Sequence, residues 1–323
     1  MAMNPFLYDY LASMKKILLL VPHYNIGLIL RMITAWVTSV RPNFKEAVRI
    51  YAERKNYIIL HWLEKRYGQT VPDKLAPPPP SKEPERIFVF WYQGVDSSLP
   101  EIVRLCISSI KRNANGREVV VITKDNISQW AAIPQYIYDR VASGSISITH
   151  LSDILRVCLL YQHGGYWIDA TVFMNAPLDD KNFNPYFGSI KIHDRHTGTI
   201  SAYRWTTFFL HAAKGSDTMK TFRDILLEFF KKQKGRIIDY FLIDYTFEML
   251  YRKCPDFRKI VDDAPFTNDD IYDLATHLNE VEPASQYFQS VSDTHIFKLN
   301  WRNRFQKKLN GEETIYGQLV NQK

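Results

Sequence analysis

One segment near the middle of the chain limits the possible folds more than any other. Residues 150–163 carry apolar side chains at helical spacing, and Gly164 and Gly165 follow at once. The spacing predicts a helix, and the glycines supply the positive φ that ends one. Residues 166–171 then read as an aromatic and aliphatic strand that carries one acid, Asp169. The apolar side chains that we expect the helix to bury recur at i, i+4, i+7 and i+8: Leu151, Leu155, Cys158 and Leu159.

Polar side chains of this segment are predicted to converge at one end of the strand. Asp153 and Arg156 are three residues apart, so they share the side of the helix that faces away from the apolar stripe. Side chains alternate along a strand, which places Trp167, Asp169 and Thr171 on one face. Open α/β sheets bind ligands at the carboxyl ends of their strands. We therefore expect a ligand-binding site here. Because burial of an unpaired charge is costly, we also expect Asp169 to have a polar or charged partner.

The residues on either side of this segment indicate the fold class. Residues 86–94 and 118–123 are short apolar runs typical of buried strands, and residues 101–112 between them have the period of an amphipathic helix. A strand, a helix and a strand at this spacing form a βαβ unit, whose strands are parallel. We expect an α/β fold with a mainly parallel sheet flanked by helices over residues 86–323.

The first 75 residues form a region of different composition, which we expect to be helical. Their apolar stripes have helical spacing and are broken near Pro22 and Pro42. Residues 1–70 contain ten Lys and Arg against four Asp and Glu, so they account for +6 of the net charge of +7. A basic segment rich in Leu, Ile, Trp and Tyr suits the anionic inner face of a membrane, and a solvated basic face packed on the main domain is the alternative. The four prolines of residues 77–80 predict a stiff linker over residues 76–85.

The sequence favours a location inside the cell. The apolar stretch at residues 17–37 is interrupted by Pro22, His23 and Arg31, so it predicts neither a transmembrane helix nor a signal peptide. The three cysteines form no C-x-x-C pair and are expected to be reduced. We expect a cytoplasmic protein that lies against the inner face of the cell membrane.

The central segment resembles the core motif of the sugar-nucleotide glycosyltransferases with a GT-A fold. The residues that carry the resemblance are Ser-Asp-Ile-Leu-Arg at 152–156 and Gly-Gly-Tyr-Trp-Ile-Asp at 164–169. They are similar to the family 32 transferases, among them the fungal initiating mannosyltransferases, and to the large glucosylating bacterial toxins. The nearest likeness is to the capsular polysaccharide synthesis proteins, in which Asp-Ala-Thr is a familiar ending of the motif. The resemblance covers roughly residues 85–305 and implies a GT-A-like fold.

The resemblance implies that the motif residues bind a nucleotide-sugar donor. The acid matching Asp153 and the base matching Arg156 contact the nucleoside part of the donor. Asp169 matches the first acid of the Asp-x-Asp motif, which holds the ribose and a divalent metal ion. Asp169 is therefore expected to serve in donor binding, in metal binding and in catalysis.

The resemblance also implies Mn²⁺ or Mg²⁺ as a cofactor. This chain has Thr171 where the Asp-x-Asp motif has its second acid. His295 or the neighbouring Asp293 is the expected substitute, so the predicted metal ligands are Asp169, Thr171 and His295. Lys298 is expected to neutralise the donor diphosphate as a point charge. A lone surface histidine on a C-terminal strand is the alternative for His295.

Two further groups complete the predicted site. Trp91, Tyr92 and Gln93 end the first strand, where an aromatic ring can stack on the nucleotide base and the amide can bond to it. An ordinary aromatic strand end is the alternative. Asp244 lies in a predicted helix and is the second predicted catalytic residue, facing the acceptor hydroxyl. A solvated acid, or an acid at the N-terminus of the helix, is the alternative for Asp244.

These observations lead to a hypothesis about function. We expect a glycosyltransferase that moves a hexose from a nucleotide sugar to a saccharide acceptor, with UDP favoured over GDP and UDP-galactose as the first candidate. The resemblance implies retention of the anomeric configuration and a lipid-linked acceptor, in the synthesis of capsule or other surface polysaccharide. The near-neutral main domain argues against a nucleic-acid partner. The alternatives are a degenerate carbohydrate-binding protein on the same fold and a scaffold at the membrane surface.

Overall fold

Five strands form the central sheet in the order β2-β1-β3-β6-β5 in the computed structural model, which describes residues 4–179 and 183–321. The strand β1 pairs in parallel with β2 and β3, whereas β6 runs antiparallel to β3 and β5. The α/β fold expected from the sequence is confirmed, although the sheet is mixed rather than mainly parallel. The strands of this sheet are β1 (Ile87–Phe90), β2 (Val119–Ile122), β3 (Gly165–Ile168), β5 (Gly188–Ser189) and β6 (Phe209–Ala212).

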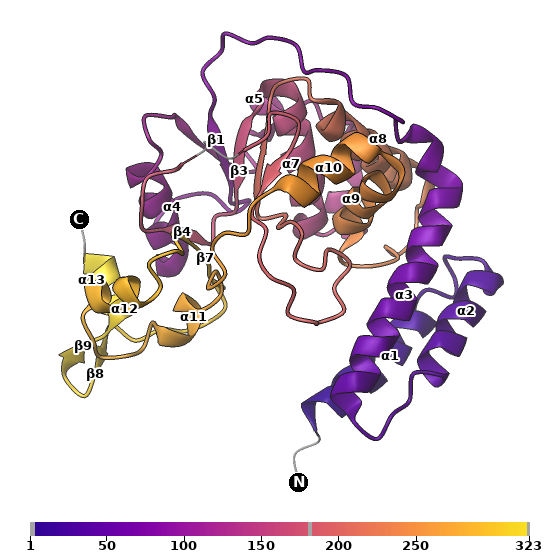
Figure 1. Cartoon of the computed structure of the whole chain (residues 1–323), viewed down its shortest axis with the longest axis horizontal. Coiled ribbons are helices and arrows are strands. Elements are labelled where there is room, and N and C mark those ends of the chain that lie inside the picture. The colour runs from indigo at the N-terminus through magenta and orange to yellow at the C-terminus, as the bar shows by residue number, and fades with distance from the viewer. Residues whose placement is uncertain (1–3, 180–182, 322–323) are drawn as a thin grey trace.

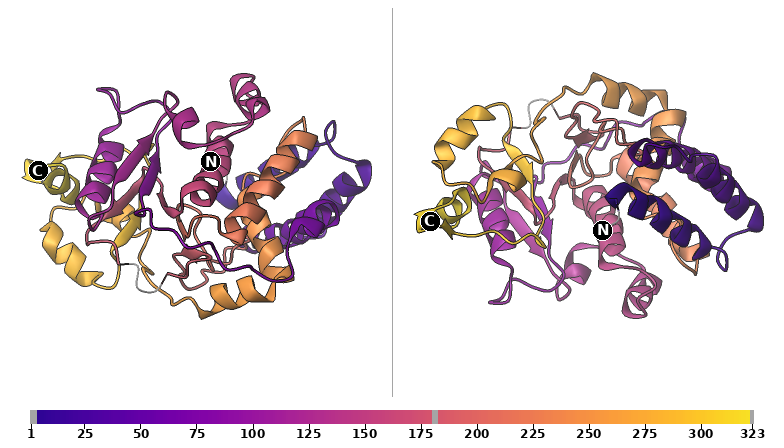
Figure 2. Two further views of the ribbon diagram at one scale, coloured as in Figure 1. Left: turned by 90° about the horizontal axis from the view of Figure 1, so that it is seen from above. Right: turned by 90° about the horizontal axis from the view of Figure 1, so that it is seen from below.

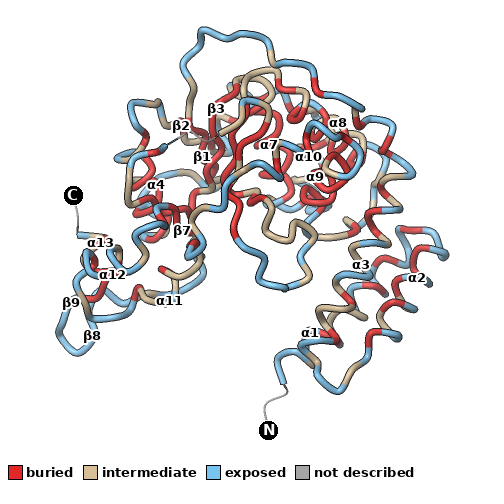
Figure 3. Tube along the Cα trace, viewed as in Figure 1, coloured by how far each residue is buried: buried red, intermediate tan, exposed pale blue. Residues whose placement is uncertain are grey.

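The central sheet separates two hydrophobic clusters. Alternate residues of β1 enter opposite clusters, with Ile87 and Val89 on one side and Phe88 and Phe90 on the other. Side chains of a strand point alternately to its two faces, so a strand that is buried on both faces must be apolar throughout. Figure 3 shows the consequence, a buried band through the sheet and the helices beside it.

Helices cover both faces of the sheet (Figures 1 and 2). The face that holds Phe88 and Trp167 packs against a layer that includes α7, α8 and α9, and the other face packs against α4 and the C-terminal helices. The helices of the main domain are α4 (Glu101–Arg112), α5 (Ile127–Trp130), α6 (Gln135–Ala142), α7 (Ile148–His163), α8 (Asp217–Lys232), α9 (Leu242–Lys253), α10 (Pro255–Asp263), α11 (Leu274–His277), α12 (Ala284–Ser290) and α13 (Ile315–Asn321).

The N-terminal region is helical, as the apolar stripes predict. It contains α1 (Pro5–Leu18), α2 (Ile26–Val37) and the long α3 (Phe44–Tyr67), followed by one 3-10 turn at Gly68–Thr70. An asparagine precedes each of the three α-helices, and its side-chain oxygen accepts a hydrogen bond from a backbone N–H of the first turn; these residues are Asn4, Asn25 and Asn43. No helix in the described ranges is long and apolar enough to cross a membrane.

The N-terminal helices share a hydrophobic cluster with the main domain. Tyr51, Ile59 and Leu63 of α3 belong to the same cluster as the buried residues of α8 and α9. Lys55 of α3 also pairs with Asp239 at 2.6 Å, in a position where both side chains are largely buried. The long helix is therefore anchored on the main domain, while α1 and α2 project from it (Figure 1).

The turn from α7 into β3 has the geometry that the double glycine predicts. Gly164 and Gly165 have φ angles of 68° and 88°, which L side chains rarely adopt. A Cβ atom on Gly165 would also overlap the carbonyl oxygen of Arg86. The turn thus lets β3 start one residue after the helix and lie directly beside β1.

The chain bends sooner after this strand than the sequence analysis expected. The strand β3 ends at Ile168, and a turn closed by Val172 N to Asp169 O at 2.9 Å follows. The next residues form β4 (Val172–Met174), which pairs antiparallel with β7 (Ile296–Lys298) in a second sheet. The turn places Asp169 at the junction of the two sheets. A third small sheet contains β8 (Lys308–Leu309) and β9 (Glu312–Glu313).

Candidate active site

The candidate site begins where β3 ends. The indole Nε1 of Trp167 donates a hydrogen bond of 2.8 Å to Oδ1 of Asp169, so the two side chains share the face that their spacing predicts. The backbone N–H of Asp169 donates to the carbonyl of Phe208, which continues the pairing with the segment before β6. One quarter of the Asp169 side chain is exposed, which leaves the carboxylate accessible to a ligand.

Arg156 of α7 links two acids of the site. Its Nη2 lies 3.3 Å from Oδ1 of Asp153 and 3.7 Å from Oδ1 of Asp169. Nη1 donates to the carbonyl oxygen of Thr207 at 2.8 Å, and Nη2 donates to the hydroxyl of Ser152 at 3.0 Å. Because Asp153 and Arg156 are both almost completely buried, these contacts offset much of the loss of hydration. The structure thus brings together the three charged residues that the motif singled out.

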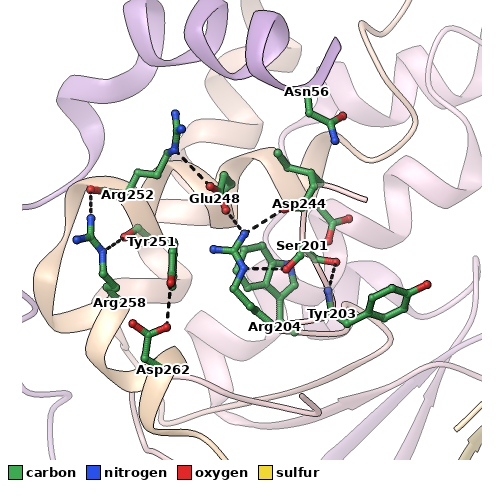
Figure 4. Close-up of polar contacts among 12 residues, drawn as sticks. Asn56, Ser201, Tyr203, Arg204, Asp244, Glu248, Tyr251, Arg252, Arg258 and Asp262 are labelled. Atoms are coloured by element: carbon green, nitrogen blue, oxygen red, sulfur yellow. Dashed lines mark hydrogen bonds and ion pairs between the residues drawn. The ribbon is translucent and has the colours of Figure 1, made fainter. Parts of the chain in front are cut away.

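Asp244 lies in the same buried region. The indole Nε1 of Trp205 donates to Oδ1 of Asp244 at 2.9 Å, and the charges of Asp153 and Arg156 act on this carboxyl. Figure 4 shows Asp244 beside a neighbouring ion pair, Arg204 with Glu248, whose Nη2 and Oε2 are 2.5 Å apart. These surroundings exclude a solvated acid, whereas the place of Asp244 in the first turn of α9 also agrees with the alternative of an acid at a helix N-terminus.

The three carboxyls of the site differ in acidity. Burial raises the pKa of Asp244 to about 7, and burial raises the pKa of Asp153 to about 6 although Arg156 opposes the shift. Burial acts on Asp169 too, but Lys298 and Arg156 outweigh it, so its pKa lies below the usual value. At neutral pH the site therefore holds one firmly ionised acid and one acid close to its midpoint. Neighbouring carboxyls with such different pKa values suit acid–base chemistry.

Lys298 completes the surroundings of Asp169. Its Nζ lies 3.2 Å from Oδ2 of Asp169 and also bonds to Oγ1 of Thr171. The strand β7 delivers this lysine, because Lys298 stands opposite Val172 in the β4–β7 pair. The side chain predicted to meet a diphosphate is therefore joined to both ends of the Asp-Ala-Thr sequence.

His295 lies apart from this group. The carbonyl of His295 accepts from the N–H of Asn175, so the histidine stands at the far end of the β4–β7 pair from Thr171. Asn175 is four positions along the chain from Thr171, a span of roughly 13 Å in an extended strand. His295 and Asp293 instead line a cavity of about 550 Å³, and the lining of that cavity includes neither Asp169 nor Asp244. The predicted metal set is therefore not assembled in this structure.

The side chains around Asp169 do not fit the divalent ion that the resemblance implies. An ion bound to Oδ2 would lie within roughly 5 Å of the Lys298 ammonium, given the usual ion–oxygen distances. At an effective dielectric constant of about 20, the repulsion between them is about 6–7 kcal/mol. Arg156 on the other carboxylate oxygen adds to this repulsion. The described residues also contain no group of three or more His, Cys, Asp and Glu arranged to hold a metal.

An aromatic pair lies at the end of β1. Trp91 packs edge-on against Trp301, with ring centroids 5.8 Å apart and an angle of 86° between the planes. The guanidinium of Arg302 lies 5.0 Å from the Trp301 ring. Trp91 and Tyr92 are half-buried and Gln93 is exposed, so the predicted base-binding residues are accessible. Because β1 and β3 are parallel and in register, this strand end lies beside Asp169.

The sequence analysis missed the segment of residues 204–208, which contacts the site three times. Trp205 bonds to Asp244, the carbonyl of Thr207 accepts from Arg156, and the Phe208 ring lies 5.3 Å from Nζ of Lys298. The residues just before it, Ala202 and Tyr203, have positive φ angles of 45° and 58°. Two adjacent non-glycine residues in this conformation indicate a backbone held in place by its surroundings. No motif marked this segment, because its role depends on contacts with distant elements.

The chain is similar to proteins of one family. A sequence profile described as capsular polysaccharide synthesis protein matches residues 41–319. The O-glycosyltransferase braB of Annulohypoxylon truncatum is 23% identical over 165 residues, which cover 49% of this chain and 37% of that protein. The chain thus spans well under two thirds of this relative. The profile match includes α3 and the whole candidate site, and it leaves α1 and α2 outside.

Two solved structures share part of the architecture. The PaToxG glycosyltransferase superposes with a TM-score of 0.40 and 15% identity, over 67% of this chain and 83% of that one. The apo-form glycosyltransferase GlyE in Streptococcus pneumoniae TIGR4 superposes with a TM-score of 0.37 and 11% identity, over 75% and 61% of the two chains.

Proposed function

Because the chain belongs to the capsular polysaccharide synthesis protein family, we propose that it is a glycosyltransferase that moves a hexose from a nucleotide sugar to a saccharide acceptor. The observation that carries this proposal is the cluster of Asp153, Arg156 and Asp169 at the carboxyl ends of parallel strands. Open α/β sheets bind ligands at the carboxyl ends of their strands, so an accessible carboxylate at this place supports a ligand site. If the protein turns over no donor, the alternative of a degenerate carbohydrate-binding protein on the same fold is favoured.

The donor would lie across the ends of β1 and β3. Trp91 and Trp301 offer ring surfaces for the base, and Asp169 offers a carboxylate to the ribose hydroxyls. Lys298 and Arg302 supply positive charge for the diphosphate. We take uracil as the base of the donor and UDP-galactose as the first nucleotide sugar to try.

The transfer requires a proton to leave the acceptor hydroxyl. The bond between C1 of the hexose and the diphosphate oxygen breaks, and its electron pair stays on that oxygen. The acceptor oxygen bonds to C1 on the same face, and its proton passes to the carboxylate of Asp244. A pKa of about 7 suits a group that accepts and returns a proton at neutral pH. The family resemblance leads us to include retention of configuration in this proposal.

The acceptor in this proposal is a lipid-linked saccharide at the inner face of the cell membrane. Large apolar side chains are exposed along α1 and α2, among them Leu11, Leu18, Ile26 and Leu30. Lys15 and Lys16 accompany them in the last turn of α1. Apolar side chains with nearby lysines match the chemistry of an anionic lipid surface.

The helix α3 connects this surface to the acceptor side of the site. Asn56 of α3 donates to the carbonyl of Gly198 at 2.9 Å and accepts from the hydroxyl of Tyr245 at 2.7 Å. Tyr245 adjoins Asp244 in α9, so the N-terminal helices and the proposed base are held in one unit. A saccharide carried on a lipid would reach Asp244 from this side.

Release of nucleoside diphosphate tests the enzymatic proposal. The full chain is incubated with UDP-, GDP- and dTDP-hexoses and a membrane extract that supplies acceptors. We expect release from one donor, its loss in Asp169→Asn and Asp244→Asn, and normal release in Asp263→Asn. Asp263 is a matched control because it is an exposed acid paired with Lys259. Equal release by all variants would contradict the assigned roles, and no release with any donor would favour the degenerate binding protein.

Sedimentation with vesicles tests the membrane proposal. We expect binding to phosphatidylglycerol vesicles, little binding to phosphatidylcholine vesicles, and loss of binding in Leu11→Glu and Ile26→Glu. Leu309→Glu is the matched control, because Leu309 is equally apolar and exposed but lies in β8. Loss of binding in the control as well, or in none of the variants, would contradict a membrane surface on α1 and α2.

A further inference from the structure

A lysine lies where the family motif has a metal. Lys298 Nζ contacts Oδ2 of Asp169 at 3.2 Å and Oγ1 of Thr171. These are the first and third residues of the Asp-Ala-Thr sequence, the two positions that carry acids in an Asp-x-Asp motif. The ammonium therefore occupies the space between them, and it carries a positive charge as a metal ion would.

The backbone holds this lysine on both sides. Its N–H donates to the carbonyl of Ile271 at 2.7 Å, and the next N–H, of Leu299, donates to the carbonyl of Thr171 at 2.8 Å. The β4–β7 register places Lys298 opposite Val172, which leaves the Thr171 side chain within its reach. A fixed backbone orients the charge before any ligand binds, and preorganised charge stabilises a leaving group most effectively.

The residue at the third position agrees with this role. If position 171 carried an acid, Lys298 would face two carboxylates, which would more than neutralise its charge and leave none for a phosphate. The hydroxyl of Thr171 is neutral, so Lys298 faces one carboxylate, that of Asp169, instead of two. An ammonium has three N–H donors, and the two contacts named use two of them.

The chain that follows the lysine is also basic. Residues 298–308 contain five Lys and Arg and no Asp or Glu. One of them, Arg302, has its guanidinium 5.0 Å from the ring of Trp301, which packs against Trp91. The segment that follows Lys298 therefore adds positive charge at the aromatic pair that ends β1.

We infer that the ammonium of Lys298, held between Asp169 and Thr171, takes the place of a divalent ion and neutralises the diphosphate of the donor. The inference rests on the proposed function, because it presupposes a nucleotide-sugar donor. As the bond to C1 breaks, the electron pair remains on the diphosphate oxygen, and an N–H of Lys298 donates to that oxygen. The lysine keeps its proton throughout, so no metal is needed to balance the charge of this step.

Titration calorimetry with UDP tests this inference on the full chain. Wild type is titrated in excess EDTA and in excess Mn²⁺, and we expect the same Kd within about twofold. Lys298→Met should bind UDP about tenfold to hundredfold more weakly, the range given by one hydrogen bond to a charged group. Uridine, which has no phosphate, should bind to both proteins alike. Lys308→Met, a lysine in β8 of the same basic segment, should bind UDP like wild type.

A second variant keeps the test decisive if Lys298→Met does not fold. Thr171→Asp restores the acid of the usual motif and gives the lysine a second carboxylate. We expect weaker UDP binding in EDTA and a partial recovery with Mn²⁺. Wild-type binding that needs Mn²⁺ would overturn the inference and leave the proposed function standing. No binding of UDP under either condition would overturn the proposed function and the inference together.

Discussion

Replacement of Asp244 by Asn tests the buried proton at the centre of the proposed site. Asp244 is 7% exposed and accepts one hydrogen bond, from Trp205. Burial raises its pKa to about 7, so the folded protein keeps this carboxyl protonated over a pH range in which the unfolded chain ionises it. Asparagine preserves the acceptor for Trp205 and never ionises. The variant thus removes the titration and little else.

The sign and size of the effect follow from proton linkage. Between about pH 4 and pH 7 the folded state binds more protons at this site than the unfolded state, so stability falls as the pH rises. Each pKa unit corresponds to about 1.4 kcal/mol. When the pH rises from about 5 to about 8, the free energy of unfolding of wild type should fall by roughly 2–3 kcal/mol relative to that of Asp244→Asn. The difference in the free energy of unfolding between the two proteins should therefore shift by this amount in favour of the variant between the two pH values.

Urea unfolding followed by tryptophan fluorescence measures this difference at both pH values. Asp153 titrates with a pKa of about 6 and remains in both proteins, so the comparison isolates Asp244. Asp263→Asn, at an exposed ion pair, should follow wild type at every pH. Asp244→Asn should also lower donor turnover by about 10²–10⁴-fold, the usual contribution of a general base. Parallel stability curves for wild type and Asp244→Asn would refute the assignment of a buried proton.

Three further variants test the rest of the site and fold. Arg156→Lys loses the contact with the Thr207 carbonyl and leaves two acids poorly paired. It should therefore lower the free energy of unfolding, measured in urea titrations, by about 3–5 kcal/mol. A decrease below about 1 kcal/mol would contradict the role of Arg156 in linking the two acids. Trp301→Ala should weaken UDP binding by about 1–3 kcal/mol in calorimetry with stability nearly unchanged, and unchanged affinity would remove the ring from the donor site. Gly165→Ala should lower the thermal midpoint far more than Gly94→Ala, because both have positive φ but only Gly165 abuts the neighbouring strand; equal losses would contradict the steric argument.

Local pattern was sufficient to predict the elements that carry the motif. The helix over residues 148–163, its double-glycine end and the strand that follows all depend on contacts within about twenty residues. The contact between Asp153 and Arg156 is local for the same reason, since both lie on one helix. The helix over residues 101–112 and the N-terminal helices were predicted on the same basis and are confirmed.

Long-range contacts could not be read from the sequence. Lys298 meets Asp169 across 129 residues, and Trp205 meets Asp244 across 39. The sequence named Lys298 as a phosphate ligand but did not place it against Thr171, because that contact depends on the pairing of β4 with β7. The same pairing moves His295 away from the predicted metal site. The strand β6, which is antiparallel to β3, was also missed. Parallel neighbours are connected by a crossover, usually a helix, which the sequence pattern can show, whereas an antiparallel neighbour needs none.

The most direct test of the proposed donor site is calorimetric titration of UDP-galactose, GDP-mannose and dTDP-glucose into wild type and Asp169→Asn. We expect one nucleotide sugar to bind to wild type, with an affinity at least about tenfold lower in Asp169→Asn, because the variant loses a charge-assisted hydrogen bond to the ligand. Equal binding by the two proteins, or no binding of any donor to wild type, would contradict the claim that this carboxylate holds a nucleotide sugar.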